Sequence, residues 1–357
     1  MTPASETGVL DTLGFGEAVR GLPEQLDAAH RAAAEVARSE FPAADEIDNV
    51  VVLGMGGSGI AGDVLAAVAN AHLRVPVTVL KQYRVPAFVG PRTLAFALSY
   101  SGSTEETLSL AEQAAARGAR LVAVSTGGPL AAIAEQAGGL HVPCPQGYMP
   151  RAALGALVAP LFVTLFRAGL LPDAHQWLTA ATEQLAARRD RCRLEVEGSA
   201  NPARELARQI GRTIPVVYGG GALGAVAALR WKADVNENAK APAFWNVYPE
   251  LDHNEICGWG QHGDVTRQVF TLVELRHGFE HPQLRRRFEI TREIIEETVS
   301  GVLSFEAAGD GRLAQLLDLM YVGDWTSLYL AYDAGVDPGP IDAIFRLKDA
   351  LAQHREN

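Results

Sequence analysis

Cysteine is scarce in this sequence and forms no cluster. The 357 residues include Cys144, Cys192 and Cys257, which lie far apart and lack the spacing of metal ligands. Structural disulfides are therefore not expected, which suits the reducing cytoplasm, the compartment that we predict for this protein. Histidine and carboxylate residues form no ligand cluster along the chain either, so we predict no metal and no other cofactor.

Long apolar runs are also absent. The first seven residues lack a cationic stretch followed by an apolar one, so no secretory signal is visible. The longest apolar stretch, residues 152–166, contains Gly155 and Pro160 and is too short to cross a bilayer. We expect a buried helix there, and no membrane as a partner.

Positive charge is outnumbered. The chain has 31 Lys and Arg against 42 Asp and Glu, a net charge of −11. Nucleic acids and anionic membranes bind clustered cations, so neither is expected as a partner. An anionic ligand would have to be held by local features rather than by the overall field.

The chain does contain a regular alternation of short apolar segments and alanine-rich segments of helical length. Apolar segments occupy residues 49–53, 76–80, 93–98, 120–124 and 140–142, and then residues 214–218, 243–248, 269–275 and 301–305. Continuous apolar strands that alternate with helices indicate parallel sheets covered on both faces. We therefore predict an α/β fold with two doubly wound parallel-sheet domains, related by internal duplication, and flanking helices.

The same pattern predicts where the domains begin and end. We expect an N-terminal helical segment at residues 1–45, a first domain at 46–170, a helical connector at 171–205, a second domain at 206–335, and a C-terminal helix at 336–357.

A glycine-rich loop follows the first predicted strand. It reads Gly54-Met55-Gly56-Gly57-Ser58-Gly59 and precedes a helix, whose free N–H groups and positive dipole end favour an anion such as phosphate. The string also satisfies G-x-G-x-x-G, the dinucleotide-binding pattern, which requires an acidic residue at the end of the second strand. Lys81 and Gln82 stand there instead. A glycine turn needed only for close packing is a third interpretation, and the loop alone does not decide among them.

A hydroxyl-rich loop follows the third predicted strand, as Ser99-Tyr100-Ser101-Gly102-Ser103-Thr104-Glu105-Glu106-Thr107. Hydroxyl and amide groups at a helix start suit a phosphoryl group. Ser103 and Glu106 alternatively fit a capping box. That pair leaves Ser99, Ser101 and Thr104 unexplained, so ligand binding is the better hypothesis.

A carboxylate and an imidazole lie further along the chain, Glu237 at the end of a helical pattern and His253 in a polar loop. Environment can move the pKa values of both groups toward neutrality, as a general base and a proton shuttle require. Alone, each is more commonly a solvated surface residue.

Taken in order, these motifs resemble a known family. Gly-Gly-Ser-Gly and Ser-Tyr-Ser-Gly-Ser-Thr-Glu-Glu-Thr look like a sugar-isomerase (SIS) domain, which has a flavodoxin-like fold and binds phosphosugars. The remaining motifs occur in the order of the bifunctional phosphoglucose/phosphomannose isomerases, namely Pro150-Arg151, Asn236-Glu237-Asn238-Ala239-Lys240, residues 249–255, and Leu347-Lys348. The resemblance implies a metal-independent aldose–ketose isomerase that interconverts glucose 6-phosphate, and mannose 6-phosphate, with fructose 6-phosphate through a cis-enediol.

The resemblance also implies a role for each matching residue. Glu237 would be the base that moves a proton between C1 and C2, and Arg151 would stabilise the enediolate. His253 would transfer a proton during ring opening or closing, reaching across from the neighbouring subunit of a homodimer. Lys348 would assist ring opening. The hexose phosphate would be held in the first domain by Gly57, Ser58, Ser99, Ser101 and Thr104.

One position departs from the family pattern. Many relatives read Asp-Pro-Thr-Pro before the terminal lysine, where this chain has Asp337-Pro338-Gly339-Pro340. The threonine is linked to accepting the C2 epimer, and glycine supplies no hydroxyl, so the resemblance supports glucose 6-phosphate more strongly than mannose 6-phosphate. Two other functions stay open at this point, a non-catalytic phosphosugar sensor and a nicotinamide-dependent oxidoreductase.

Overall fold

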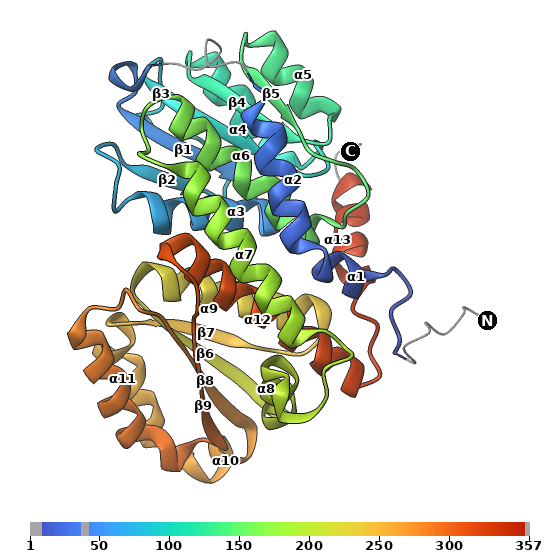
Figure 1. Cartoon of the computed structure of the whole chain (residues 1–357), viewed down its shortest axis with the longest axis vertical. Helices are drawn as coiled ribbons and strands as arrows, with labels where there is room; N and C mark the ends of the chain where they lie inside the picture. The colour runs from blue at the N-terminus through green and yellow to red at the C-terminus, as the bar shows by residue number, and fades with distance from the viewer. Residues whose placement is uncertain (1–8, 37–42, 354–357) are drawn as a thin grey trace.

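The computed structural model describes residues 9–36 and 43–353, which contain two parallel sheets, one above the other in Figure 1. The first sheet has five strands in the order β2-β1-β3-β4-β5 and the second has four in the order β7-β6-β8-β9. The strands are β1 Asn49–Gly54, β2 Val77–Leu80, β3 Thr93–Leu98, β4 Arg120–Ser125, β5 Leu140–Pro143, β6 Ile214–Gly220, β7 Phe244–Tyr248, β8 Phe270–Arg276 and β9 Gly301–Glu306. Every pairing is parallel, so the predicted fold class is confirmed.

The two sheets repeat one topology. If β6 is equated with β1, the order β7-β6-β8-β9 reproduces β2-β1-β3-β4, and the second sheet lacks only a counterpart of β5. This agreement is what an internal duplication of one doubly wound unit predicts. In such sheets ligands bind beyond the carboxyl ends of the strands, where the strand order reverses. That point lies between β1 and β3 in the first domain and between β6 and β8 in the second.

Both faces of the first sheet are buried because its strands are apolar on both sides. One face packs on α3 Gly56–Ala69 and α6 Leu154–Arg167, with α2 Leu22–Ala34 outside them. The other packs on α4 Glu105–Ala116 and α5 Gly128–Gln136. The predicted buried helix at residues 152–166 is therefore α6, and all but its last two residues are buried.

The second sheet is covered in the same way. α9 Gly221–Asn238 and α12 Gly311–Asp333 pack on one face, with α8 Pro202–Ile210 against α12. α11 Pro282–Ile295 packs on the other, together with the short 3₁₀ segments η5 Glu250–His253 and η6 Glu255–Gly260 and with α10 Gly263–Val269. α9 ends at Asn238, one residue after Glu237, and Lys240 then adopts a left-handed conformation with φ 55° that does not continue the helix.

One hydrophobic core joins the two domains. It runs from β1 and β3 through α3, α6, α9 and α12 to β6 and β8, and α7 Ala174–Cys192 packs on both α2 and α12. α1 Phe15–Arg20 and α2 lie in the predicted N-terminal helical segment, of which residues 1–8 and 37–42 are outside the described residues. No described helix is both long enough and apolar enough to cross a membrane.

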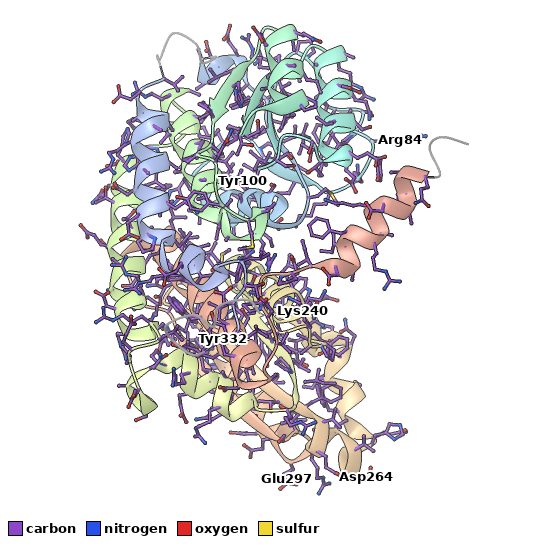
Figure 2. All side chains as sticks on the ribbon, turned by 90° about the vertical axis from the view of Figure 1, so that its right-hand side faces the viewer. Arg84, Tyr100, Lys240, Asp264, Glu297 and Tyr332 are labelled. Atoms are coloured by element: carbon purple, nitrogen blue, oxygen red, sulfur yellow. The ribbon has the colours of Figure 1, made fainter. Side chains whose placement is uncertain are left out.

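The C-terminal helix α13, Asp342–Gln353, differs from all of these because none of its described residues is buried. It projects from the body of the protein in Figure 2 and exposes Phe345 and Leu347.

A pair of histidines links α2 to α7 and makes fold stability depend on pH. His30 Nε2 lies 2.6 Å from His175 Nδ1, and burial and the neighbouring imidazole lower the pKa of His30, opposed in part by Asp27. The folded state therefore binds protons less readily than the unfolded chain, and stability falls as pH drops through the usual histidine pKa of about 6.5.

We predict a lower melting temperature at pH 5.5 than at pH 7.5, and a smaller difference in the His30→Gln variant. Thermal unfolding followed by circular dichroism at both pH values tests this. His72→Gln, at an exposed histidine, is the matched control and should behave like the parent. An unchanged pH dependence in His30→Gln would contradict the assignment.

Candidate active site

The glycine loop after β1 is packed tightly against the segment that carries Arg151. A Cβ built on Gly57 would lie 3.1 Å from the Pro150 carbonyl oxygen and 3.3 Å from Arg151 Cα, so there is little room for a side chain. Ser58, on the first turn of α3, is buried. β2 ends at Leu80, and the following Lys81 pairs with Asp63 of α3. No acidic residue stands at the end of β2 to bind a ribose, which disfavours the dinucleotide interpretation.

The hydroxyl loop after β3 forms a connected cluster. The buried Ser99 hydroxyl lies 2.9 Å from Thr104 Oγ1 and 3.4 Å from Ser101 Oγ, and Ser103 Oγ donates to Ser101 Oγ at 3.1 Å. Gly102 has φ 69°, and a Cβ there would lie 1.9 Å from the Gly127 carbonyl oxygen, so only glycine fits this turn.

The alternative capping-box interpretation is wrong. α4 begins at Glu105, so its N-cap is Thr104 and Ser103 lies one residue too early. No side chain among the described residues caps this helix. The hydroxyl groups are therefore not used to cap the N-terminus of α4.

The two loops lie close together. Because β1 and β3 are neighbours, with Gly54 opposite Leu98, both loops flank the point where the strand order reverses.

The equivalent point of the second domain is filled by that domain's own side chains. The buried His277, which follows β8, contacts the Gly220 carbonyl oxygen through Nε2 at 2.9 Å. Its backbone N–H donates to Glu280, and Phe288 lies against Gly220. The second crevice is therefore the one that protein side chains occupy.

Arg151 is the cation that connects the first domain to the second. Its side chain is buried, with Nε donating to Asn238 Oδ1 at 3.0 Å and Nη2 to the carbonyl oxygens of Gly339, at 2.8 Å, and Pro338. The guanidinium also stacks over the Phe15 ring at 4.2 Å. Burial lowers the pKa of Arg151, and the nearby Glu237 carboxylate opposes that shift.

Glu237 lies on the last turn of α9, half-buried and beside this cation. The asparagines on either side fix its position, because Asn238 donates to Ser327 Oγ at 2.9 Å and Asn236 to the Ala241 carbonyl oxygen at 2.9 Å. The Glu237 carboxylate itself accepts no hydrogen bond from the described residues. The Asn-Glu-Asn motif is thus two structural amides around an unpaired carboxylate.

Lys240 is a second cation at this place, which sequence reasoning did not single out. Its left-handed backbone turns the side chain back, so that Nζ donates to the carbonyl oxygens of Glu237 at 2.5 Å and Pro338 at 3.2 Å. Burial and the neighbouring Arg151 lower the pKa of Lys240. Together, Arg151 and Lys240 hold the turn that precedes α13.

A buried ionic cluster behind Glu237 was also missed. Arg230 lies 2.9 Å from Asp324 of α12 and 2.8 Å from Asp234, one turn before Glu237, and donates to the Arg151 carbonyl oxygen at 2.9 Å. These three side chains are almost wholly buried, so they fix α9 to α12 and to the first domain. The spacing of four residues between Arg230 and Asp234 indicates an ion pair in the sequence alone. The second ion pair, of Arg230 with Asp324, has no such signal in the sequence.

His253 does not join Glu237 in the same chain. Glu237 precedes β7 and His253 follows it, so the two residues lie toward opposite ends of this strand. His253 is exposed and its imidazole makes no hydrogen bond to the described residues, whereas its neighbours are fixed. Asp252 accepts from Arg287 at 2.7 Å and Thr291 at 2.9 Å.

Lys348 is likewise not placed next to Glu237. It lies on the exposed helix α13, in Figure 2, on the same helical face as Ile344 and Leu351. Position 339, where the resemblance led us to expect threonine, is tightly enclosed. A Cβ there would lie 2.8 Å from Leu13 Cβ and 3.0 Å from Leu13 Cγ, so the Leu13 side chain takes the space that a threonine would need.

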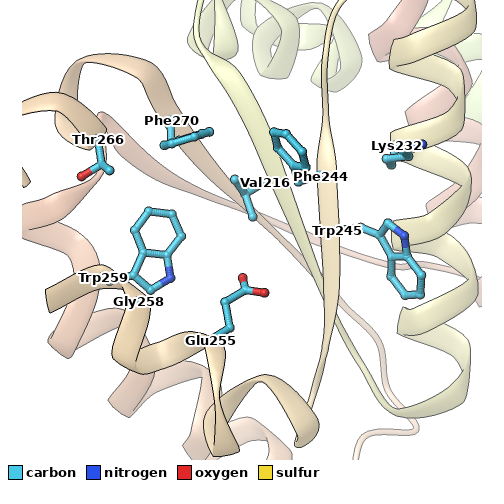
Figure 3. A pocket seen from close by; sticks show the side chains of 9 residues that line it. All are labelled: Val216, Lys232, Phe244, Trp245, Glu255, Gly258, Trp259, Thr266 and Phe270. Carbon is cyan, nitrogen blue, oxygen red and sulfur yellow. The ribbon is translucent and has the colours of Figure 1, made fainter. Parts of the chain in front are cut away.

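A cavity of about 560 Å³ lies elsewhere, on the second domain (Figure 3). None of the predicted site residues lines it; the lining is formed by Val216, Lys232, Phe244, Trp245, Glu255, Gly258, Trp259, Thr266 and Phe270. Among the described residues, no group of three or more His, Cys, Asp or Glu side chains is arranged to hold a metal ion.

Comparison with known proteins adds to this geometry. The SIS domain family matches residues 45–166, and a family described as the bacterial phospho-glucose isomerase C-terminal SIS domain matches residues 199–351. A bifunctional phosphoglucose/phosphomannose isomerase of Caldicellulosiruptor bescii is 37% identical over 340 residues, covering 95% of this chain and 99% of the relative. Another, of Aquifex aeolicus, is 34% identical and covers 85% of this chain and 91% of the relative.

A solved structure, of a glucose-6-phosphate isomerase like protein from Thermus thermophilus, superposes with a TM-score of 0.60. It covers 94% of this chain and 96% of that protein at 21% identity, which supports the shared fold alone.

Proposed function

Because this chain belongs to the bifunctional phosphoglucose/phosphomannose isomerase family, we propose that it interconverts glucose 6-phosphate and mannose 6-phosphate with fructose 6-phosphate. We extend this proposal to a metal-independent proton transfer through a cis-enediol, carried out in the cytoplasm. One observation carries the extension. Arg151 contacts the glycine loop, the residue after Glu237 and the turn before α13, which supports a site at this junction between the domains.

In this proposal the phosphoryl group of the hexose is held beyond β1 and β3. Ser99, Ser101 and Thr104 offer hydroxyl groups, Ser58 a further one, and Gly57 lets the backbone approach. The hydroxyl cluster supports this assignment, because neither helix capping nor a ribose-binding acid accounts for it. The sugar carbons would then extend toward the second domain.

Glu237 would be the base that moves a proton between C1 and C2. Its carboxylate is unpaired among the described residues yet lies beside Arg151 and Lys240. Negative charge that develops on the enediolate would face these fixed cations, which is how preorganised charges lower a barrier. The asparagine contacts that position residue 237 would keep its carboxylate aimed at the same place in every turnover.

Ring opening would use Lys348 and a histidine from a second copy of the chain. Lys348 and His253 are both exposed in the single chain. The residue before His253, Asp252, is fixed by hydrogen bonds from Arg287 and Thr291. An imidazole presented outward without a partner suits a group that acts on another molecule. We therefore propose a homodimer with shared active sites. For mannose 6-phosphate, Gly339 supplies no hydroxyl, so we expect lower activity than with glucose 6-phosphate.

The rival functions predict other results. A phosphosugar sensor would bind fructose 6-phosphate without turnover, and an oxidoreductase would bind a nicotinamide cofactor. Lys81, which follows β2 and pairs with Asp63 of α3, argues against the oxidoreductase. No observation on the described residues favours the first.

We predict that Glu237→Gln lowers kcat for fructose 6-phosphate by about 10²- to 10⁴-fold, the usual worth of a positioned general base. The dissociation constant should change little, because the phosphate is held by other residues. Turnover in EDTA, with both aldose products measured, and calorimetric binding test this. Glu112→Gln, at an exposed glutamate of α4, is the control. A parent protein that binds but does not turn over, or a parent that EDTA inactivates, would contradict the proposal.

The shared site predicts complementation between two inactive variants. Glu237→Gln and His253→Ala, co-expressed with different tags, should form mixed dimers in which one of the two sites has both native residues. Random pairing would then restore about a quarter of the native activity. A purified mixed dimer without activity, or a fully active protein that sediments as a monomer, would show that His253 does not act across subunits.

A further inference from the structure

The cavity of the second domain has the features of a separate binding site. Figure 3 shows Trp245 and Lys232 on one side of the β7 ribbon and the other labelled residues on the opposite side. On that opposite side, Phe244, Trp259 and Phe270 line the cavity together with the Glu255 carboxylate, an arrangement we call the aromatic cage.

The three rings of the aromatic cage stand at steep angles to one another. Trp259 and Phe270 have an interplanar angle of 89° with centroids 6.0 Å apart, and Phe244 and Phe270 have an angle of 69° with centroids 6.4 Å apart. Such edge-to-face contacts are a normal packing arrangement of aromatic rings, so the space for a ligand lies beside the rings rather than between them. Here the rings line a cavity of about 560 Å³, a size suited to a small-molecule site, and Phe244 is 54% exposed, so the cage is open to solvent.

Glu255 supplies the charge of the aromatic cage. Its carboxylate accepts hydrogen bonds from the Tyr218 hydroxyl and from Asn246 Nδ2, the latter at 2.5 Å, and Trp259 Nε1 donates to the same Tyr218 hydroxyl at 3.2 Å. Burial raises the pKa of Tyr218, which keeps the phenol protonated as the donor. A carboxylate has about four acceptor positions, so two donors leave capacity for a ligand.

These features select one class of ligand. The Glu255 carboxylate repels phosphates and other anions, and Lys232, which also lines the cavity, lies on the other side of β7, so this side disfavours the hexose phosphate of the proposed reaction. The faces of aromatic rings carry negative potential and attract cations that lie within about 6 Å of the ring centroid. Alkylammonium groups combine a positive charge with an apolar surface, and so match both the rings and the carboxylate.

We propose that the aromatic cage formed by Phe244, Trp259, Phe270 and Glu255 binds a small organic cation with an alkylammonium group. This site is distinct from the proposed isomerase site, and it does not depend on that function. Glu255 belongs to the motif that contains His253, and the two residues flank Asn254, whose side chain accepts from the Glu255 N–H at 2.6 Å. The assignment gives this part of the motif a role beyond supporting the histidine loop.

Choline and its neutral isostere 3,3-dimethylbutan-1-ol test the proposal on the full-length protein. We expect choline to bind measurably and the alcohol to bind at least about fivefold more weakly, because a cation–π contact contributes about 1 kcal/mol. Tryptophan fluorescence and ligand-observed NMR measure both. Glu255→Gln and, independently, Trp259→Leu should each weaken choline binding at least about fivefold. Phe345→Ala, which removes an exposed ring on α13, is the matched control and should leave binding unchanged.

Three outcomes would overturn the proposal. The first is equal binding of choline and the alcohol, which would make the cavity a non-selective apolar surface. The second is undiminished choline binding in both Glu255→Gln and Trp259→Leu. The third is no choline binding at tens of millimolar, together with a Phe244→Ser variant that sediments as a monomer where the parent is a dimer, because the cage would then be covered by a second copy of the chain.

Discussion

The arrangement of this protein depends on one buried cation. Arg151 leaves the end of the first domain and places its guanidinium against the Asn238 side chain and the carbonyl oxygens of Pro338 and Gly339. A buried charge is costly unless it is hydrogen-bonded and compensated, so these partners, the Phe15 ring and the nearby Glu237 carboxylate form one unit. Removing a partner of such a buried cation typically lowers the free energy of unfolding by about 3–5 kcal/mol, and we expect a loss of this size at this junction.

That junction lies between two domains whose equivalent crevices differ. The two domains repeat a strand order, and each has a crevice where the order reverses. In the first domain the crevice is lined by glycine and hydroxyl groups, and the Arg151 segment packs against its glycine loop. In the second, His277 and Phe288 occupy the corresponding space. The second domain instead contributes the end of α9, where the carboxylate of residue 237 meets the cations of the junction.

Much of the fold was predictable from the sequence because its signals are local. The β1 and β3 strands are continuous apolar runs, and both are followed by glycine-containing loops at helix starts. The site was less predictable, because its contacts join residues far apart in the chain. Arg230 meets Asp324 across 94 positions and Arg151 meets Gly339 across 188, and no local periodicity encodes such pairs. The capping-box alternative was wrong because α4 has Thr104 as its N-cap, one residue after the Ser103 that the pattern requires.

We expect a phosphate held beyond β1 and β3 to place the reacting carbons of the hexose at residue 237. A crystal structure of the Glu237→Gln protein with fructose 6-phosphate tests it most directly. In that structure we expect phosphate oxygens about 3 Å from the hydroxyls of Ser99 and Ser101. We also expect the side-chain amide of residue 237 to lie within about 3.5 Å of C1 or C2 of the sugar. A phosphate bound elsewhere, or a sugar chain directed away from α9 with residue 237 facing solvent, would contradict it.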